Sequence, residues 1–316
     1  MPAPETTFRP PPVVAIVGPT AAGKSDLSLS LAEELGGEVV NTDSMQVYRG
    51  MDIGTAKLGV EERRGIPHHL LDLLDVTEPA TVAEFQGWAR DVIADCRGRG
   101  VTPVLVGGSA LYTRAVLDRF EFPGTDPAVR RQLEDELAEV GPEAMHRRLT
   151  AVDADAAAKI EPGNGRRIVR ALEVVAITGR PFSASLPELR YHYPDAHQIG
   201  VDIPRPVLDE RIALRVQRMW EAGFVDEVRR LADRGLREGR TASRALGYQQ
   251  VLAFLDGEIT EEQALEQTVT GTRRFARRQD SWFRKDPRIT WVGWDDPERM
   301  ARALAAVAAA RDAAEV

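Results

Sequence analysis

The chain has 316 residues, of which 43% are hydrophobic and 28% charged, and this composition is typical of a globular protein with about two domains. Its only cysteine, Cys96, excludes a disulfide framework and a zinc site built from cysteines. The formal net charge of −8 argues against a nucleic-acid partner for the chain as a whole. Net charge does not, however, reveal a basic surface that is segregated from the acidic residues.

The N-terminal segment, residues 1–12, contains five prolines and lacks the apolar core of a secretory signal, so we interpret it as a flexible tail. No apolar stretch of the sequence is long enough to cross a membrane. Together these features predict a cytoplasmic protein without membrane contact.

A phosphate-binding loop follows the apolar run of residues 13–17 and precedes a helical pattern over residues 26–35. It consists of Gly18, Pro19, Thr20, Ala21, Ala22, Gly23, Lys24 and Ser25. In such loops backbone N–H groups turn toward an anion, the lysine neutralises the outer phosphates, and the hydroxyl after it can hold magnesium. The pattern predicts a bound polyphosphate, but it does not say whether that group belongs to a nucleotide.

Strand and helix patterns alternate through the first third of the chain. We expect further strands at residues 38–41, 69–75 and 101–106, and a helix at residues 83–97. Because apolar strands that alternate with helices form a covered parallel sheet, the fold is predicted to be α/β with a P-loop-type parallel sheet core. Ligands of such sheets lie at the carboxyl ends of the strands, where Asp43 and the turn at residues 107–109 would join the phosphate loop.

The pattern changes near residue 118. Residues 120–124 have the composition of a linker. The pattern of residues 127 to about 186 predicts helices and no clear strand. Strand patterns return at 198–203 and 289–292, helices are expected at 207–222 and 225–231, and an alanine-rich surface helix at 301–314. We therefore predict a mainly helical domain inserted into the core: tail 1–12, first core part 13–117, insertion 118–197, and second core part with C-terminal helices 198–316.

Asp43 is a carboxylate that follows a strand beside the phosphate loop. It can act as a magnesium ligand or a general base, or it can cap a turn or helix. Thr20 and Ser109 are hydroxyls on glycine-flanked turns that can bind a ligand or cap a turn. His68 and His69 lack partners at metal-ligand spacing, so we do not expect them to bind a metal.

Two groups of arginines stand out against the negative net charge. One is formed by Arg166, Arg167 and Arg170, and the other includes Arg277 and Arg278. Each group can bind nucleic acid or can be a solvated helix face. The segment with Arg244, Tyr248 and Gln249 suits stacking and polar recognition of a nucleotide, although a helix start with a surface tyrosine has the same pattern.

An ordered series of motifs over roughly residues 13–292 resembles the tRNA dimethylallyltransferase family of the bacterial type. The series comprises the phosphate loop, residues 43–57, 67–72, 107–112 and 170–174, Arg244 with residues 247–249, and residues 277–279 and 282–284. Residues 43–57 are its most specific part. Ala22 and Ser109 replace a serine and a threonine that are common in the family, and Ser109 keeps the hydroxyl.

The resemblance implies an enzyme that transfers the dimethylallyl group of dimethylallyl diphosphate to N6 of adenosine 37, next to the tRNA anticodon, giving N6-isopentenyladenosine and diphosphate. The phosphate loop would hold the diphosphate with Mg²⁺ at Ser25, Asp43 would accept the amine proton, and Lys24 and Ser109 would assist catalysis. The target base would have to flip out of its stack. We expect a monomer.

With this resemblance, the insertion is expected to bind tRNA, and tRNA contacts are expected from both parts of the chain. The expected contact residues are Asp43, Ser44, Met45, Gln46, Ser109, Arg130, Arg166, Arg167, Ile168, Val169, Arg170, Arg244, Gly247, Tyr248, Gln249, Arg277 and Arg278.

Three other functions are compatible with the same motifs, because the fold alone does not decide the chemistry. A small-molecule kinase would turn over ATP. A prenyltransferase for free adenine nucleotides would form product on AMP without tRNA. An RNA chaperone that binds nucleotides would bind RNA without forming any product.

Overall fold

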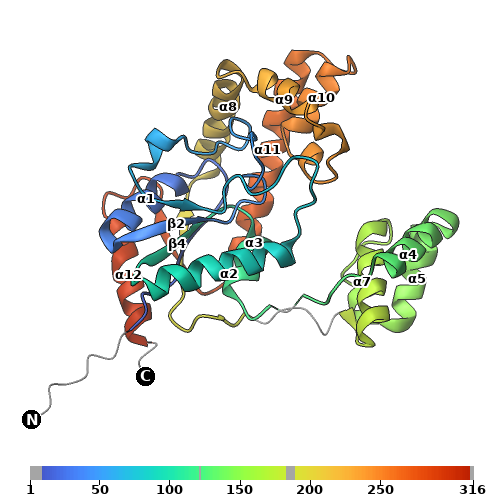
Figure 1. The fold of residues 1–316 in the computed structure, drawn as a ribbon, viewed down its shortest axis with the longest axis horizontal. Coiled ribbons are helices and arrows are strands. Elements are labelled where there is room, and N and C mark those ends of the chain that lie inside the picture. The colour runs from blue at the N-terminus through green and yellow to red at the C-terminus, as the bar shows by residue number, and fades with distance from the viewer. Residues whose placement is uncertain (1–8, 121, 183–188, 314–316) are drawn as a thin grey trace, which may run out of the picture. The chain divides into compact units, whose positions relative to one another are not determined.

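The computed structural model describes residues 9–120, 122–182 and 189–313. The chain forms two compact units: a core unit of Met1–Leu117 with Tyr191–Val316, and an insertion unit of Asp118–Arg190 (Figure 1). Most of the expected tail (residues 1–8), one residue of the expected linker (121) and the end of the expected helical stretch (183–186) lie outside the described residues.

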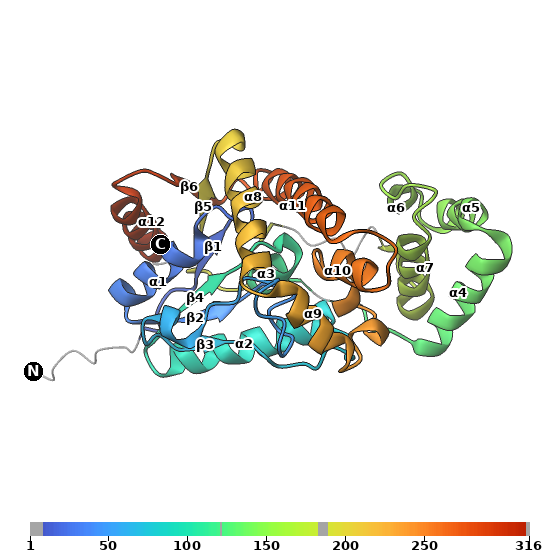
Figure 2. The same cartoon turned by 90° about the horizontal axis from the view of Figure 1, so that it is seen from above.

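The core unit contains a six-stranded sheet with the order β3-β2-β4-β1-β5-β6, and every neighbouring pair of strands is parallel (Figure 2). The strands are β1 Val14–Val17, β2 Gly37–Asn41, β3 His68–His69, β4 Thr102–Val106, β5 His197–Asp202 and β6 Ile289–Gly293. The prediction of an α/β fold with a P-loop-type parallel sheet is thereby confirmed.

The strand expected over residues 69–75 was wrong in extent, since β3 is two residues long. Leu70 and Asp72 adopt positive φ angles of 62° and 57°. Such angles bend the chain out of the extended conformation, so pairing with β2 ends at His69.

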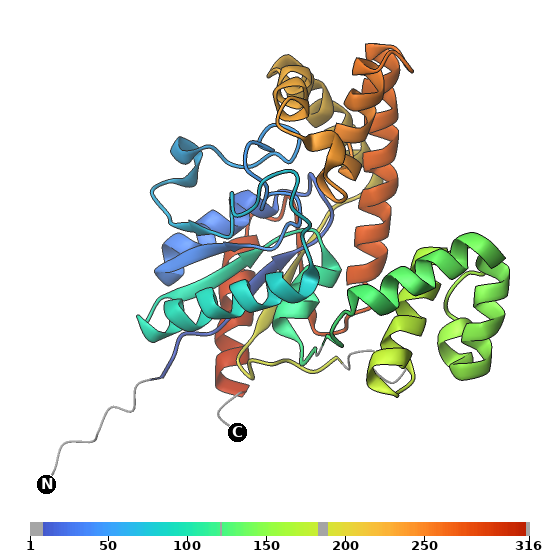
Figure 3. The same cartoon turned by 45° about the vertical axis from the view of Figure 1, so that its right-hand side comes forward.

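Helices cover both faces of the sheet. Helices α1 (Lys24–Leu35) and α12 (Arg299–Ala313) lie on one face, and α2 (Val82–Gly98) and α3 (Ala110–Leu117) on the other. Side chains alternate along β1, so Ile16 packs in the cluster of α1 and α12 while Ala15 packs in the cluster of α2 and α3. Figure 3 shows the teal α2 on the near side of the sheet and the red α12 behind it.

Four further helices of the core unit pack on one another. They are α8 (Arg205–Glu221), α9 (Phe224–Ala232), α10 (Tyr248–Leu255) and α11 (Glu261–Phe283). Helix α11 begins with a capping box in which the Thr260 hydroxyl accepts from the Gln263 amide and the Gln263 side chain accepts from the Thr260 amide. These helices bring residues late in the chain to the phosphate loop.

The insertion unit has a hydrophobic core of its own. Its helices are α4 (Pro127–Val140), α5 (Pro142–Val152), α6 (Ala154–Ala157) and α7 (Gly165–Thr178). Leu133, Met145, Leu149 and Leu172 belong to one buried cluster within this unit. Asp126 and Asn164 cap the starts of α4 and α7 by accepting backbone N–H bonds, so local sequence signals begin these helices where the structure has them.

Candidate functional site

A cavity of about 410 Å³ lies in the core unit and is lined by Thr20 of the phosphate loop, by residues of the segments that follow β2 and β4, and by residues from the region of helices α8 to α11. Its polar lining includes Thr20, Asp43, Ser109, Arg215 and Arg278. Its apolar lining is formed by Met45, Ile212, Val216, Met219, Phe224, Leu246 and Phe275. The cavity thus combines charged groups with an apolar wall large enough for a small hydrocarbon group.

The phosphate loop follows β1 and leads directly into α1. Gly18 and Gly23 have φ angles of 134° and 97°, which L-residues rarely adopt. A side chain on Gly18 would also lie 3.2 Å from the carbonyl oxygen of Val201. The Lys24 ammonium donates a hydrogen bond of 2.8 Å to the carbonyl oxygen of Pro19, so the loop folds back over its own lysine.

Gln279 on α11 joins the two glycine-rich turns of the site. Its side-chain oxygen accepts a bond of 2.9 Å from the Thr20 amide, and its nitrogen donates one of 2.8 Å to the Gly108 carbonyl. A Cβ on Gly108 would lie 2.3 Å from the Gln279 nitrogen, so a side chain at this position would displace the Gln279 amide. This buried amide therefore fixes the spacing between the phosphate loop and the turn that carries Ser109.

Two cations and one carboxylate interact within the site. Burial lowers the pKa of Lys24 to about 7, the charge of Arg215 adds to this shift, and Asp43 opposes it. Burial also lowers the pKa of Arg215, where Asp43 again favours the charged form. One turn earlier on α8, Arg211 donates to the Ala21 carbonyl at 2.9 Å. An anion bound here would meet partly desolvated positive charge, for which its attraction is strong.

Asp43 lines the cavity and also stabilises its own turn. One of its carboxylate oxygens accepts a bond of 2.8 Å from the Met45 amide, and its backbone amide donates one of 2.8 Å to the Asn41 side chain. The turn-capping role and the position in the cavity are therefore both present. The capping bond holds the carboxylate in place at the end of β2.

The structure brings together several of the other expected site residues and leaves others outside the cavity. The lining includes Ser44, Met45, Ser109, Arg244, Gly247, Tyr248, Gln249 and Arg278. Gln46 instead donates to the Thr55 carbonyl, and Ser25 and Arg277 are exposed without lining the cavity.

Tyr248 does not lie on the surface, so the alternative of a surface tyrosine at a helix start is wrong. Its side chain is fully buried, and its hydroxyl donates a bond of 2.6 Å to the carboxylate of Glu227. Its ring packs edge-on against Phe224, with 5.0 Å between ring centroids. A ring held on these sides supports the wall of the cavity, and it offers no free face on which a base could stack.

The insertion unit corrects part of the expected tRNA surface. Ile168 and Val169 are buried in its core, because the helical period of α7 turns them inward, so their side chains cannot contact tRNA. Arg130 and Arg170 both pair with Glu173, whose side chain is fully buried. Arg166 and Arg167 are exposed on the first turn of α7.

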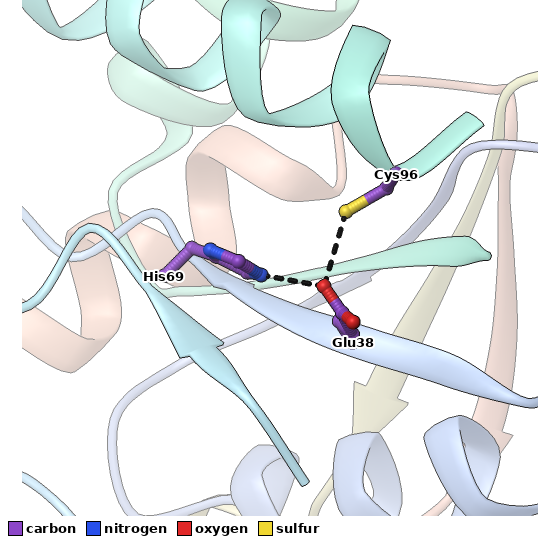
Figure 4. A group of neighbouring side chains, drawn as sticks. All are labelled: Glu38, His69 and Cys96. Carbon is purple, nitrogen blue, oxygen red and sulfur yellow. Dashed lines mark hydrogen bonds and ion pairs between the residues drawn. The ribbon is translucent and has the colours of Figure 1, made fainter. Parts of the chain in front are cut away.

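A second group of polar side chains, Glu38, His69 and Cys96, lies between β2, β3 and α2, and its potential ligand atoms lie within 4.8 Å of one another (Figure 4). Arg99 donates to both oxygens of Glu38, at 2.9 and 2.7 Å, and lowers its pKa to about 2. Burial raises the pKa of the Cys96 thiol to about 11, so the thiol stays protonated. We assign this group to an ion-pair network rather than to a metal site.

Sequence reasoning missed three residues of the site: Gln279, Arg215 and Glu227. Gln279 stood inside a recognised motif, but its partner Thr20 lies 259 residues away in the chain. Arg215 could have been noticed from its spacing to Arg211, since residues four apart share a helix face. No local signal marks Glu227.

Among the described residues, no helix has the length and apolar character needed to cross a membrane.

Comparison with known proteins gives consistent matches. The family described as IPP transferase matches residues 46–286. A tRNA dimethylallyltransferase of Nocardioides sp. strain JS614 is 67% identical over 301 residues, which cover 95% of this chain and 97% of the relative. The solved tRNA isopentenylpyrophosphate transferase of Bacillus halodurans is 40% identical, with a TM-score of 0.72 and coverage of 96% and 98%. A eukaryotic dimethylallyltransferase solved while acting on tRNA is 28% identical, with a TM-score of 0.81 and coverage of 95% and 78%.

Proposed function

Because the chain belongs to the IPP transferase family, we propose that it transfers the dimethylallyl group of dimethylallyl diphosphate to N6 of adenosine 37, beside the anticodon of tRNA. The observation that carries this proposal is a single cavity in which a phosphate loop, a carboxylate and an apolar wall meet. The apolar wall suits the hydrocarbon group of such a donor.

The donor binds with its diphosphate at the phosphate loop and its hydrocarbon against the apolar wall. Lys24 and Arg215 supply positive charge, and α1 begins at Lys24, where the N-terminus of a helix favours an anion. These groups favour departure of the diphosphate, because negative charge grows on it as the allylic C–O bond breaks. Ser109 and Thr20, which line the cavity, are placed to donate hydrogen bonds there.

Asp43 acts as the general base. The N6 lone pair attacks C1 of the dimethylallyl group, the bond from C1 to oxygen breaks, and diphosphate leaves with that electron pair. The proton lost from N6 passes to the Asp43 carboxylate, which the Met45 amide holds in orientation.

Mg²⁺ fits the site through few protein ligands. The Ser25 hydroxyl is exposed directly after Lys24 and would provide one oxygen ligand, with water and diphosphate oxygens as the others. When bound, the ion would neutralise charge on the leaving diphosphate.

The insertion unit, Asp118–Arg190, is proposed as the tRNA-binding domain and would contact the tRNA backbone through Arg166 and Arg167. Both side chains are exposed at the N-terminus of α7, where the helix dipole also favours phosphate. On the core unit, Arg244, Arg277 and Arg278 are exposed and serve the same partner. We propose that the protein acts as a monomer in the cytoplasm.

The proposal is tested by incubating the protein with dimethylallyl diphosphate, Mg²⁺ and unmodified tRNA, followed by mass analysis of the nucleosides. N6-isopentenyladenosine at position 37 is the expected product. Parallel incubations with AMP in place of tRNA, and with ATP in place of the donor, test the two other activities. Product on AMP, or phosphoryl transfer from ATP without any prenylated nucleoside, would contradict the proposal.

A further inference from the structure

Glu227 on α9 is a buried carboxylate whose partners are backbone amides and a phenol. It is 3% exposed, and no Lys or Arg pairs with it in the described part of the chain. Its two oxygens accept bonds from the consecutive amides of Asp52, Ile53 and Gly54, at 3.1, 2.7 and 3.2 Å. The Tyr248 hydroxyl donates the fourth bond, at 2.6 Å.

Four donors on one buried carboxylate make a strong anchor, because hydrogen bonds to a charged acceptor are about twice as strong as neutral ones. The anchor joins three segments that lie far apart in the chain: residues 52–54, the first turn of α9, and the start of α10. Deletion of the charge would leave several buried donors without an acceptor, which is costly.

The anchored segments form one part of the cavity wall. Gly54, Phe224 and Tyr248 all line the cavity, and Phe224 lies one turn before Glu227 on the same helix. A Cβ on Gly54 would lie 2.2 Å from the Phe224 ring and 2.6 Å from the Tyr248 ring. The backbone at Gly54 therefore packs directly on both rings. A shift of this backbone, after loss of the hydrogen bonds to Glu227, would change the volume of the cavity beside the two rings.

The same segment is tied to the surroundings of Asp43. Gln46, three residues after Asp43, donates to the Thr55 carbonyl at 3.1 Å, and Thr55 follows Gly54. The wall at residues 54–55 and the turn that begins at Asp43 are thus parts of one hydrogen-bonded loop.

We propose that Glu227 is a positioning residue that fixes the apolar wall and thereby sets the prenyl chain length that the enzyme accepts; this inference rests on the proposed function. The anchor contacts the hydrocarbon side of the cavity and none of Lys24, Thr20 or Gln279, which hold the phosphate side. Its loss should therefore change the recognition of the hydrocarbon and leave the recognition of diphosphate intact.

The test compares Glu227→Gln and Tyr248→Phe with the wild type. The first replaces one acceptor oxygen by a donor, and the second removes only the phenol O–H. Asp226→Asn is the matched control, since Asp226 neighbours Glu227 but is exposed and pairs with Arg229. For each protein, kcat/KM is measured with dimethylallyl diphosphate and with geranyl diphosphate, and inorganic diphosphate is measured as a competitive ligand.

For Glu227→Gln we expect kcat/KM for dimethylallyl diphosphate to fall roughly tenfold to a hundredfold, with a smaller loss in Tyr248→Phe. The ratio of kcat/KM for dimethylallyl diphosphate to that for geranyl diphosphate should fall by about tenfold, because a more mobile cavity wall can accommodate the longer chain. Inorganic diphosphate should bind as to wild type, and the control should resemble wild type throughout.

An unchanged preference in both variants, with equal losses for the two donors, would reduce Glu227 to a purely structural residue and overturn the proposal. Where Glu227→Gln does not fold, Tyr248→Phe alone decides by the same ratio. If the wild-type protein transfers no prenyl group, both the proposed function and this inference are refuted. If the wild-type protein transfers the group and both variants keep the wild-type ratio of kcat/KM for the two donors, only this inference is refuted.

Discussion

Lys24 should take up a proton when the diphosphate donor binds. In the free protein, burial beside Arg215 lowers the pKa of Lys24 to about 7. A bound diphosphate brings negative charge next to the ammonium and raises that pKa again, because an opposite charge favours the charged form. Binding and protonation of Lys24 are therefore linked.

The size of this linkage follows from the free-state pKa. With a pKa near 7, Lys24 is about half protonated at pH 7 and about one tenth protonated at pH 8. Donor binding should then take up about half a proton at pH 7 and about nine tenths of a proton at pH 8. Donor affinity should fall about fivefold between pH 7 and pH 8, and by nearly tenfold per pH unit above pH 8 until the pKa of the bound state is reached.

Calorimetry of donor binding without tRNA, in buffers of different ionisation enthalpy, measures this uptake directly. Lys24→Arg is the control, because an arginine stays charged over the whole range and any proton that the donor itself exchanges appears in both proteins. The difference between the two proteins isolates Lys24. Equal uptake in both proteins from pH 7 to pH 8.5 would refute the reasoning.

Three further predictions concern other parts of the molecule. Asp43→Asn should lower turnover about a hundredfold or more while donor affinity changes little; near-normal single-turnover rates would remove Asp43 as the base. Arg166→Ala and Arg167→Ala should each reduce the slope of log tRNA affinity against log salt by about one unit, as expected for the loss of one phosphate contact. An unchanged slope would show that the first turn of α7 faces solvent and does not contact tRNA. Arg99 lowers the pKa of Glu38 from 4.5 to about 2, so the stabilisation it gives is present above pH 4.5 and is lost as the pH falls toward 2. Glu38→Gln should therefore flatten the acid side of the stability curve, measured by urea unfolding between pH 2 and pH 6, and an unchanged acid side would contradict this contribution.

The strands and the phosphate loop could be predicted because their signals are local. Apolar runs such as the one at β1, followed by glycines and a helical pattern, allow few other structures. The extent of β3 could not be predicted, since positive φ at Leu70 and Asp72 has no marker in residue type. This segment nevertheless belongs to the sheet, because His68 and His69 pair with β2.

The contacts that complete the site could not be read from the sequence, because they join distant segments. Gln279 meets Thr20 across 259 residues, and Glu227 meets the amide of Ile53 across 174. A tyrosine at the start of a helix has the same pattern whether it faces solvent or a buried carboxylate. Only the packing of α9 on α10 decides that Tyr248 faces inward.

The arginines show why residue counts predict a tRNA surface poorly. In the stretch from Arg166 to Arg170, the helical period sends Ile168 and Val169 into the core and leaves the arginines outside. Arg130 on α4 and Arg170 on α7 share the one carboxylate of the buried Glu173 on α7, and the pair of Arg130 with Glu173 links α4 to α7. On the proposed function, the exposed Arg166 and Arg167 form a smaller and more localised surface for tRNA than the composition suggests. A localised surface of this kind is compatible with a net charge of −8, because phosphate contacts respond to nearby charge within a Debye length and are screened from the rest.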